Sequence, residues 1–125
     1  MQNKLHRMKK TIVLVCVTFY LVNCVSSKKS TRNLFDSYLP TEKELTVAQK
    51  TNTIITLNDL KNGHAIYFNQ CIECHKAYDI PKFSERKWKH EIDDMSPKAN
   101  LTAAQKTLLS NYVLSFREAN AVVVK

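Results

Sequence analysis

The sequence predicts a small all-α domain. Three segments begin with a residue that can cap a helix N-terminus, namely Thr56, Ser84 and Thr102, and each continues with apolar residues at helical spacing. No segment alternates apolar and polar residues as a strand does until 121–124, which is too short to build a sheet. We therefore expect about three main helices, preceded by a signal peptide and a tether.

Residues 1–23 have the organisation of a signal peptide. Four basic residues and no acid lie between positions 4 and 10, and the 12 residues 11–22 are mostly apolar. A membrane-spanning helix needs about 20 apolar residues, so this run is short for a transmembrane anchor. We expect the rest of the chain to be exported to the periplasm or the outside of the cell.

The end of this segment resembles the lipobox of bacterial lipoproteins. Leu21, Val22 and Asn23 precede Cys24, which the resemblance makes the lipidated first residue of the mature chain, although Asn23 stands where Gly, Ala or Ser is usual. The alternative is an incidental cysteine near an ordinary cleavage site. With lipidation, the protein is a membrane-anchored lipoprotein, and Val25, which is not Asp, favours the outer membrane over the inner one.

Residues 24–53 are expected to form the lipid-anchored cysteine and a polar tether with little structure of its own. Removing residues 1–23 takes away four basic residues and lowers the formal charge from +8 to +4, so no nucleic-acid partner is expected.

Residues 54–125 are expected to form the domain. A first helix is predicted from Thr56 to about Asn69, and a second from Ser84 to Pro97, with Trp88, Ile92 and Met95 on one face. The helix after Thr102 has an apolar stripe made of Leu108, Leu109, Tyr112, Val113 and Phe116. A domain of about 70 residues buries a marginal apolar area, and a bound cofactor would add to its core.

Cys71-Ile72-Glu73-Cys74-His75 is the attachment motif for haem c. Two thiols three positions apart can each add to one vinyl group of the haem, and the histidine that follows is then held beneath the iron. A structural zinc site commonly uses a second pair of ligands, and no second C-x-x-C or H-x-H pair exists here. A thioredoxin-like dithiol belongs to a βαβ unit, which this sequence does not predict.

Met95 is the candidate for the sixth iron ligand. It is the only methionine beyond residue 23, and electron-transfer cytochromes often use methionine there. The alternative is that Met95 only completes the apolar stripe of the second helix. His90 and His64 are the other candidates, His64 being the weaker one.

These segments together resemble the small class I cytochrome c domains of bacterial lipoproteins, over about Leu57 to Phe116. The matching parts are Gly63 to Tyr67 ahead of the Cys71–His75 motif, then Trp88 to Met95, then Leu101-Thr102 with Leu109 to Val113. The resemblance implies that Gly63 and Tyr67 cross against Leu108, Leu109 and Tyr112. It also implies a carbonyl near Ile80-Pro81 as a possible partner of the proximal histidine.

The sequence therefore predicts a monomeric mono-haem electron carrier, not an enzyme. Cys71 and Cys74 would attach one haem c, His75 and Met95 would ligate its iron, and the partners would be redox proteins. Two alternatives remain open: a five-coordinate haem sensor, which needs Met95 off the iron, and a redox subunit of a larger membrane-associated oxidoreductase.

Overall fold

The computed structural model describes residues 33–73 and 76–121. The chain divides into two units, residues 1–37 and 38–125. In the first unit, residues 33–37 form a short helix in which the Ser37 hydroxyl donates to the Leu34 carbonyl at 2.8 Å. The predicted signal peptide and Cys24 lie outside the described residues.

The second unit is built from helices, and its described part, residues 38–73 and 76–121, contains no strand. Its α-helices are α2 (Glu42–Gln49), α3 (Leu57–Asn69), α4 (Glu85–Lys98) and α5 (Ala103–Ala119). Two 3₁₀ turns, η1 (Cys71–Glu73) and η2 (Ile80–Lys82), lie between α3 and α4. The all-α prediction is confirmed for this part of the chain, where no helix has the length and apolar character needed to cross a bilayer.

The three predicted helix starts are confirmed. The side chains of Thr56, Ser84 and Thr102 each accept a hydrogen bond from the backbone N–H three residues later. At α3 and α5 the residue three positions on, Asp59 or Gln105, bonds back to the cap, which completes a capping box. These local bonds satisfy backbone groups that the first helical turn leaves without partners.

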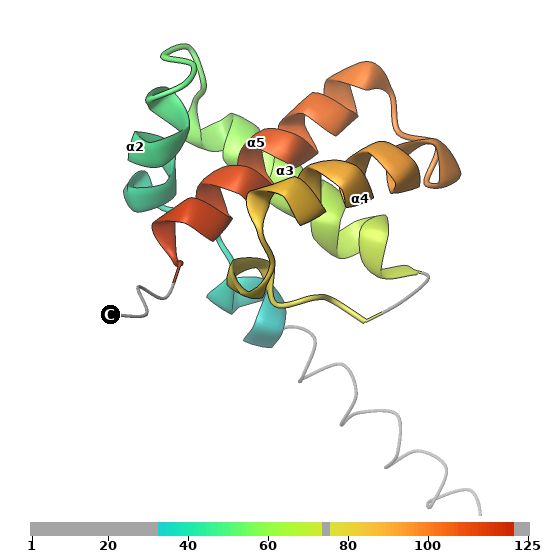
Figure 1. The fold of residues 1–125 in the computed structure, drawn as a ribbon. Helices are drawn as coiled ribbons and strands as arrows, with labels where there is room; N and C mark the ends of the chain where they lie inside the picture. Colours follow the sequence, from blue (N-terminus) through green and yellow to red (C-terminus); the bar gives the residue numbers. More distant parts are fainter. Residues whose placement is uncertain (1–32, 74–75, 122–125) are drawn as a thin grey trace, which may run out of the picture. The chain divides into compact units, whose positions relative to one another are not determined.

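Helices α3 and α5 form the centre of this unit and cross at Gly63 (Figure 1). A Cβ atom on Gly63 would lie 2.6 Å from the Cβ of Tyr112 and would overlap the backbone carbonyl of Leu108. Only glycine allows the two backbones to approach this closely. The crossing that the sequence resemblance implied is therefore present.

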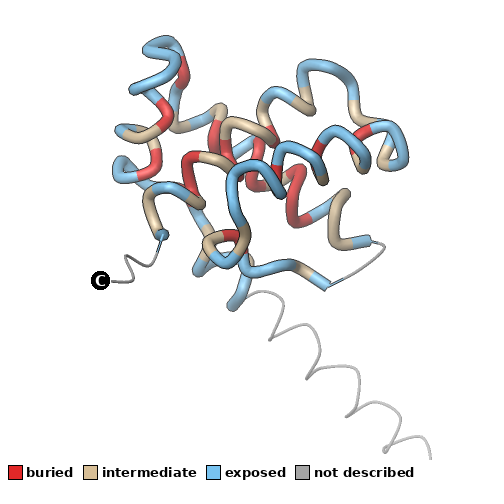
Figure 2. Tube along the Cα trace, in the orientation of Figure 1, coloured by how far each residue is buried: buried red, intermediate tan, exposed pale blue. Residues whose placement is uncertain are grey.

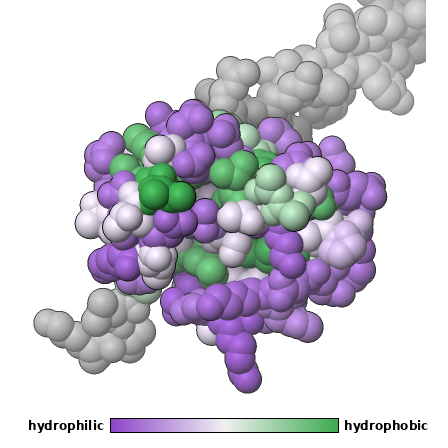
Figure 3. All heavy atoms as spheres, turned by 90° about the horizontal axis from the view of Figure 1, so that it is seen from above, coloured by the Kyte–Doolittle hydropathy of each residue, from purple (hydrophilic) through white to green (hydrophobic). Residues whose placement is uncertain are grey.

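Helices α2 and α4 pack on different sides of α5 (Figure 1). Buried residues gather where the helices face one another (Figure 2). The fully buried side chains include Leu60, Tyr67, Ile80, Tyr112 and Val113. On the face shown in Figure 3 hydrophilic residues predominate, and apolar residues reach the surface in a few places between them.

The prediction of little structure before residue 53 is wrong for residues 42–49, which form α2. This helix packs on α5 and begins with a capping box in which Thr41 and Glu44 bond to each other. Ala48 of α2 is buried with Ile55 and Leu60, so the packed helices begin at Glu42 and not at residue 54. The carboxylate of Glu44 is buried too and holds α2 by hydrogen bonds instead of apolar contact.

The prediction that Pro97 ends the second helix is also wrong, because α4 continues through Pro97 to Lys98. The helix is ended by a turn centred on Asn100, whose φ is 53°. The N–H of Leu101 donates to the Ser96 carbonyl at 2.9 Å, and the N–H of Asn100 donates to the Pro97 carbonyl at 3.1 Å. These two bonds are those of a Schellman motif, and asparagine tolerates the left-handed conformation that the motif requires.

Candidate functional site

A cavity of about 390 Å³ lies between α3, α4 and α5, with the start of the C-x-x-C-H motif in its wall. Each helix contributes apolar side chains to it, and the main ones are Tyr67 from α3, Trp88 and Ile92 from α4, and Leu109 and Val113 from α5. Small-molecule and cofactor sites have volumes of about 300–1,000 Å³ and mostly apolar walls. The cavity therefore has the size and lining of a cofactor site.

Two of the predicted site residues, Cys71 and Met95, lie in the wall of this same cavity. Cys71 belongs to the η1 turn that follows α3, and Met95 lies in the last turn of α4. The fold thus brings together two residues that are 24 positions apart in the sequence. Cys74 and His75 lie outside the described residues.

The other candidate ligands lie elsewhere. His90 is exposed on α4, and His64 is buried in α3 between aromatic rings, with ring-centroid distances of 4.8 Å to Phe68 and 5.4 Å to Tyr112. Neither side chain lines the cavity. Of these three residues, Met95 alone contributes to the cavity wall.

The thiol of Cys71 is in an environment that disfavours its ionised form. Burial raises the pKa of Cys71 from about 9 to about 11, so the group is a neutral thiol at pH 7. Reactive and metal-binding cysteines lie in surroundings that lower the pKa. Within the described residues, no group of three or more His, Cys, Asp or Glu side chains is arranged to hold a metal ion.

One polar atom in the cavity wall lacks a partner among the described groups. The side-chain oxygen of Gln70 is buried and accepts no hydrogen bond there, although Gln70 lines the cavity. Buried polar atoms in folded proteins nearly always have a partner. This oxygen is therefore expected to bond to a group that enters the cavity.

Trp88 lies at the boundary between the cavity and a smaller one of about 260 Å³, and Tyr78 and Glu91 line both. The indole N–H of Trp88 donates to the carbonyl of Ile80 at 2.9 Å, so this buried group has a backbone oxygen as its partner. The Ile80 carbonyl belongs to the Ile80-Pro81 segment, in which the sequence resemblance implied a possible partner for the proximal histidine. In this structure it accepts from Trp88.

Several residues of the cavity wall were not identified as site residues in the sequence analysis, among them Gln70, Tyr78 and Leu101. Gln70 and Tyr78 flank the C-x-x-C-H motif, and proximity to the motif was the only signal that pointed to them. Leu101 lies in the wall because the Schellman turn at Asn100 folds the chain back towards α4.

Comparison with known proteins gives no match: no family model fits the chain, and no curated protein or solved structure is significantly similar to it.

Proposed function

We propose that this protein is a mono-haem c-type cytochrome that carries electrons outside the cytoplasm. The observation that carries the proposal is the shared cavity: Cys71 of the C-x-x-C-H motif and Met95 lie in the wall of one apolar hollow of cofactor size. Cys71 and Cys74 would form the two thioether bonds, and His75 and Met95 would ligate the iron from opposite sides. When bound, haem c supplies a one-electron redox centre.

The described residues fit such a group. Tyr67, Trp88 and the aliphatic side chains of α4 and α5 give the cavity a mostly apolar lining, which suits an apolar macrocycle.

Two filled axial positions would make the protein a carrier and not a catalyst, because no position would remain open for a substrate. Whether the second axial position is filled depends on Met95. Since it lies in the last turn of a helix that a Schellman motif closes, its backbone is held firmly, and its side chain lines the cavity. This geometry favours the carrier over the five-coordinate haem sensor.

We infer the location and the partners of the protein from its signal-peptide, lipobox and C-x-x-C-H motifs. Cleavage before Cys24 and lipidation of that residue would anchor the chain to the periplasmic side of a membrane, with the outer membrane favoured. The donor and the acceptor would be redox proteins, and a larger membrane-associated oxidoreductase would be one setting for such a carrier.

The carrier proposal is tested by the visible spectrum of the full chain produced with a cytochrome c maturation system. In the oxidised protein, a bond between the Met95 sulfur and the iron gives a charge-transfer band at the red edge of the spectrum. We expect this band in the wild type and in His90→Ala, and its loss in Met95→Leu, which keeps an apolar side chain in the wall.

In all three proteins the haem should stay covalently attached, as shown by intact mass. If Met95→Leu keeps the band, or if the wild type lacks it, Met95 is not the iron ligand. The result would then favour the five-coordinate haem sensor.

A further inference from the structure

The segment that follows the haem motif is held at three consecutive residues by three aromatic side chains from different parts of the chain. Tyr67 of α3 bonds to Tyr78, Tyr38 bonds to Asp79, and Trp88 of α4 bonds to Ile80. No two of these aromatic residues are neighbours in the sequence. Residues 78–80 are therefore fixed by tertiary contacts, although only Ile80 belongs to a regular element.

Tyr67 makes the most complete of these attachments. Its hydroxyl donates to the Tyr78 carbonyl at 2.8 Å and accepts from the Tyr78 N–H at 2.9 Å. One side-chain atom thus bonds to both the backbone N–H and the backbone carbonyl of Tyr78. Tyr67 is only 2% exposed, so water cannot easily replace either bond.

The Tyr67 hydroxyl remains able to donate and to accept a hydrogen bond over the whole working pH range. Burial raises the pKa of Tyr67 well above its ordinary value of 10, so the group remains a neutral O–H that donates and accepts. The ring is positioned independently by edge contacts with Phe68 and Trp88, with centroid distances of 5.1 and 6.1 Å. The ring therefore has a packing role, and the hydroxyl has a separate one.

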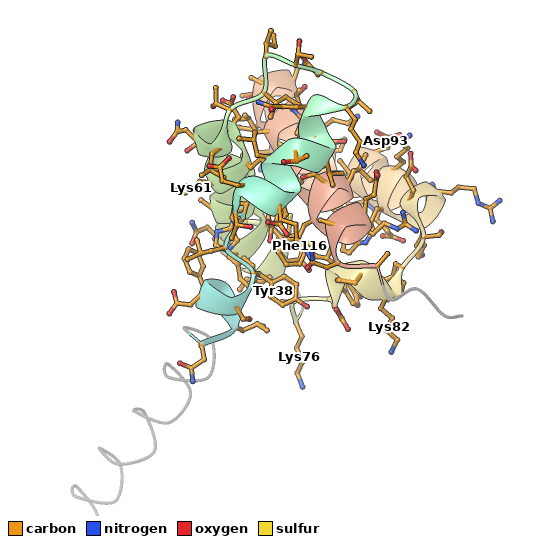
Figure 4. The ribbon with its side chains drawn as sticks, turned by 90° about the vertical axis from the view of Figure 1, so that its left-hand side faces the viewer. Tyr38, Lys61, Lys76, Lys82, Asp93 and Phe116 are labelled. Atoms are coloured by element: carbon orange, nitrogen blue, oxygen red, sulfur yellow. The ribbon has the colours of Figure 1, made fainter. Side chains whose placement is uncertain are left out.

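The Tyr38 attachment is held in place by further contacts. The ring of Tyr38 stacks on Phe116 with centroids 4.9 Å apart and planes 12° apart, and Figure 4 shows the two rings beside each other. The carbonyl of Tyr38 accepts from the Tyr112 hydroxyl at 3.0 Å. Tyr112 thus offers a second buried tyrosine whose hydroxyl bonds to a backbone carbonyl outside residues 78–80.

We propose that Tyr67 is a positioning residue. Its hydroxyl fixes residues 78–80 and thereby restrains the chain next to His75, the proposed iron ligand. Tyr78 is only three residues beyond His75, so the chain that leaves the ligand is anchored almost at once. Tyr67 also lines the cavity in which the haem would lie. This inference rests on the proposed function, and it adds a role for the hydroxyl that neither the motif nor the apolar pattern assigns.

The test compares Tyr67→Phe with the matched control Tyr112→Phe in the full haem-loaded chain. Both changes delete one buried hydroxyl and keep the ring, so both should lower stability by similar amounts. Only Tyr67→Phe removes bonds to the backbone of Tyr78, because the Tyr112 hydroxyl bonds to the Tyr38 carbonyl and is linked to Asp79 only through the Tyr38 side chain. We expect hydrogen exchange of the Tyr78 amide to rise about tenfold in Tyr67→Phe relative to Tyr112→Phe, because one well-formed hydrogen bond is lost at that site.

The second readout is the reduction potential. Loosening of the chain next to the haem admits water, which stabilises the more positively charged oxidised form, so Tyr67→Phe should have a lower potential than both the wild type and Tyr112→Phe. Equal exchange rates, or equal potentials, in the two variants would overturn the inference while leaving the proposed function intact. A wild-type chain that gains no haem would overturn the proposed function, and with it the link between Tyr67 and a haem.

Discussion

Gly63 shows how a single residue sets the distance between the two central helices. A helix interior normally disfavours glycine relative to alanine by roughly 0.5–1 kcal/mol, so its presence here needs a tertiary reason. The reason is the space that α5 takes: the Leu108 carbonyl and the Tyr112 Cβ occupy the volume that a side chain would need. Because both Tyr67 and Leu109 reach the cavity from these helices, the crossing also sets the shape of the candidate site.

Gly63→Ala should therefore destabilise the protein although alanine is the better helix former. Both obstructing groups belong to or adjoin the α5 backbone and cannot rotate away, so we expect a loss of about 2–3 kcal/mol in the free energy of unfolding. Urea denaturation measures this loss. Asn62→Ala, at the exposed neighbouring position of α3, is the control and should change stability by less than about 0.5 kcal/mol. An unchanged midpoint for Gly63→Ala would mean that the helices are not in such close contact.

At the scale of helices, the sequence predicted best those features that depend on neighbouring residues. The starts of α3, α4 and α5 follow from side chains that bond to their own first turn. Helix α2 was missed because it has few apolar residues, although Thr41 and Glu44 have the same spacing as Thr56 and Asp59. The end of α4 was misplaced because a proline is tolerated in its last turn, and the stop is made by Asn100.

The candidate site likewise has features that the sequence predicts and features that it does not. Cys71 and Met95 could be identified from residue type and spacing, and they line one cavity. The attachments of residues 78–80 could not be identified, because each joins a side chain to a group that only the folded chain brings near. The hydroxyl of Tyr67, for example, bonds to backbone groups 11 residues away.

Helix α2 should depend on pH through Glu44, which accepts from the Thr41 N–H at 2.8 Å, the Thr41 hydroxyl at 2.7 Å and the Asn120 amide at 2.9 Å. Burial raises the pKa of this carboxyl, but the hydrogen bonds from Thr41 and Asn120 lower it by more, so the pKa lies below its ordinary value of 4.5. A carboxyl with a lowered pKa stabilises the fold above its unfolded pKa, and this contribution is lost as the pH falls through the folded value.

Glu44→Gln should accordingly lower the free energy of unfolding by about 1–2 kcal/mol at pH 7, because one of its accepting oxygens becomes a donor. The difference from wild type should shrink as the pH falls below about 4.5. Thermal unfolding at a series of pH values measures it. Glu42→Gln, in the exposed first turn of the same helix, is the control, and a constant difference across the series would contradict a role for the charge of Glu44.

The chain combines a small helical domain with an N-terminal segment whose sequence predicts a signal peptide and a lipidated Cys24. Its described residues place Cys71 and Met95 in the wall of one cavity between the central helices, and the proposed haem site rests on that observation. A domain of this size gains little stability from its own core, so an attached cofactor that fills the cavity would be part of the fold as well as the source of its function.

The most direct test of this account is the intact mass of the full chain after expression with a cytochrome c maturation system and extraction with acidified acetone, which removes haem that is not covalently bound. We predict that the wild type retains the mass of one haem and that the double variant Cys71→Ala, Cys74→Ala retains none. A wild-type mass without haem would contradict the central claim, and Cys71 and Cys74 would then have to be a dithiol or part of a metal site.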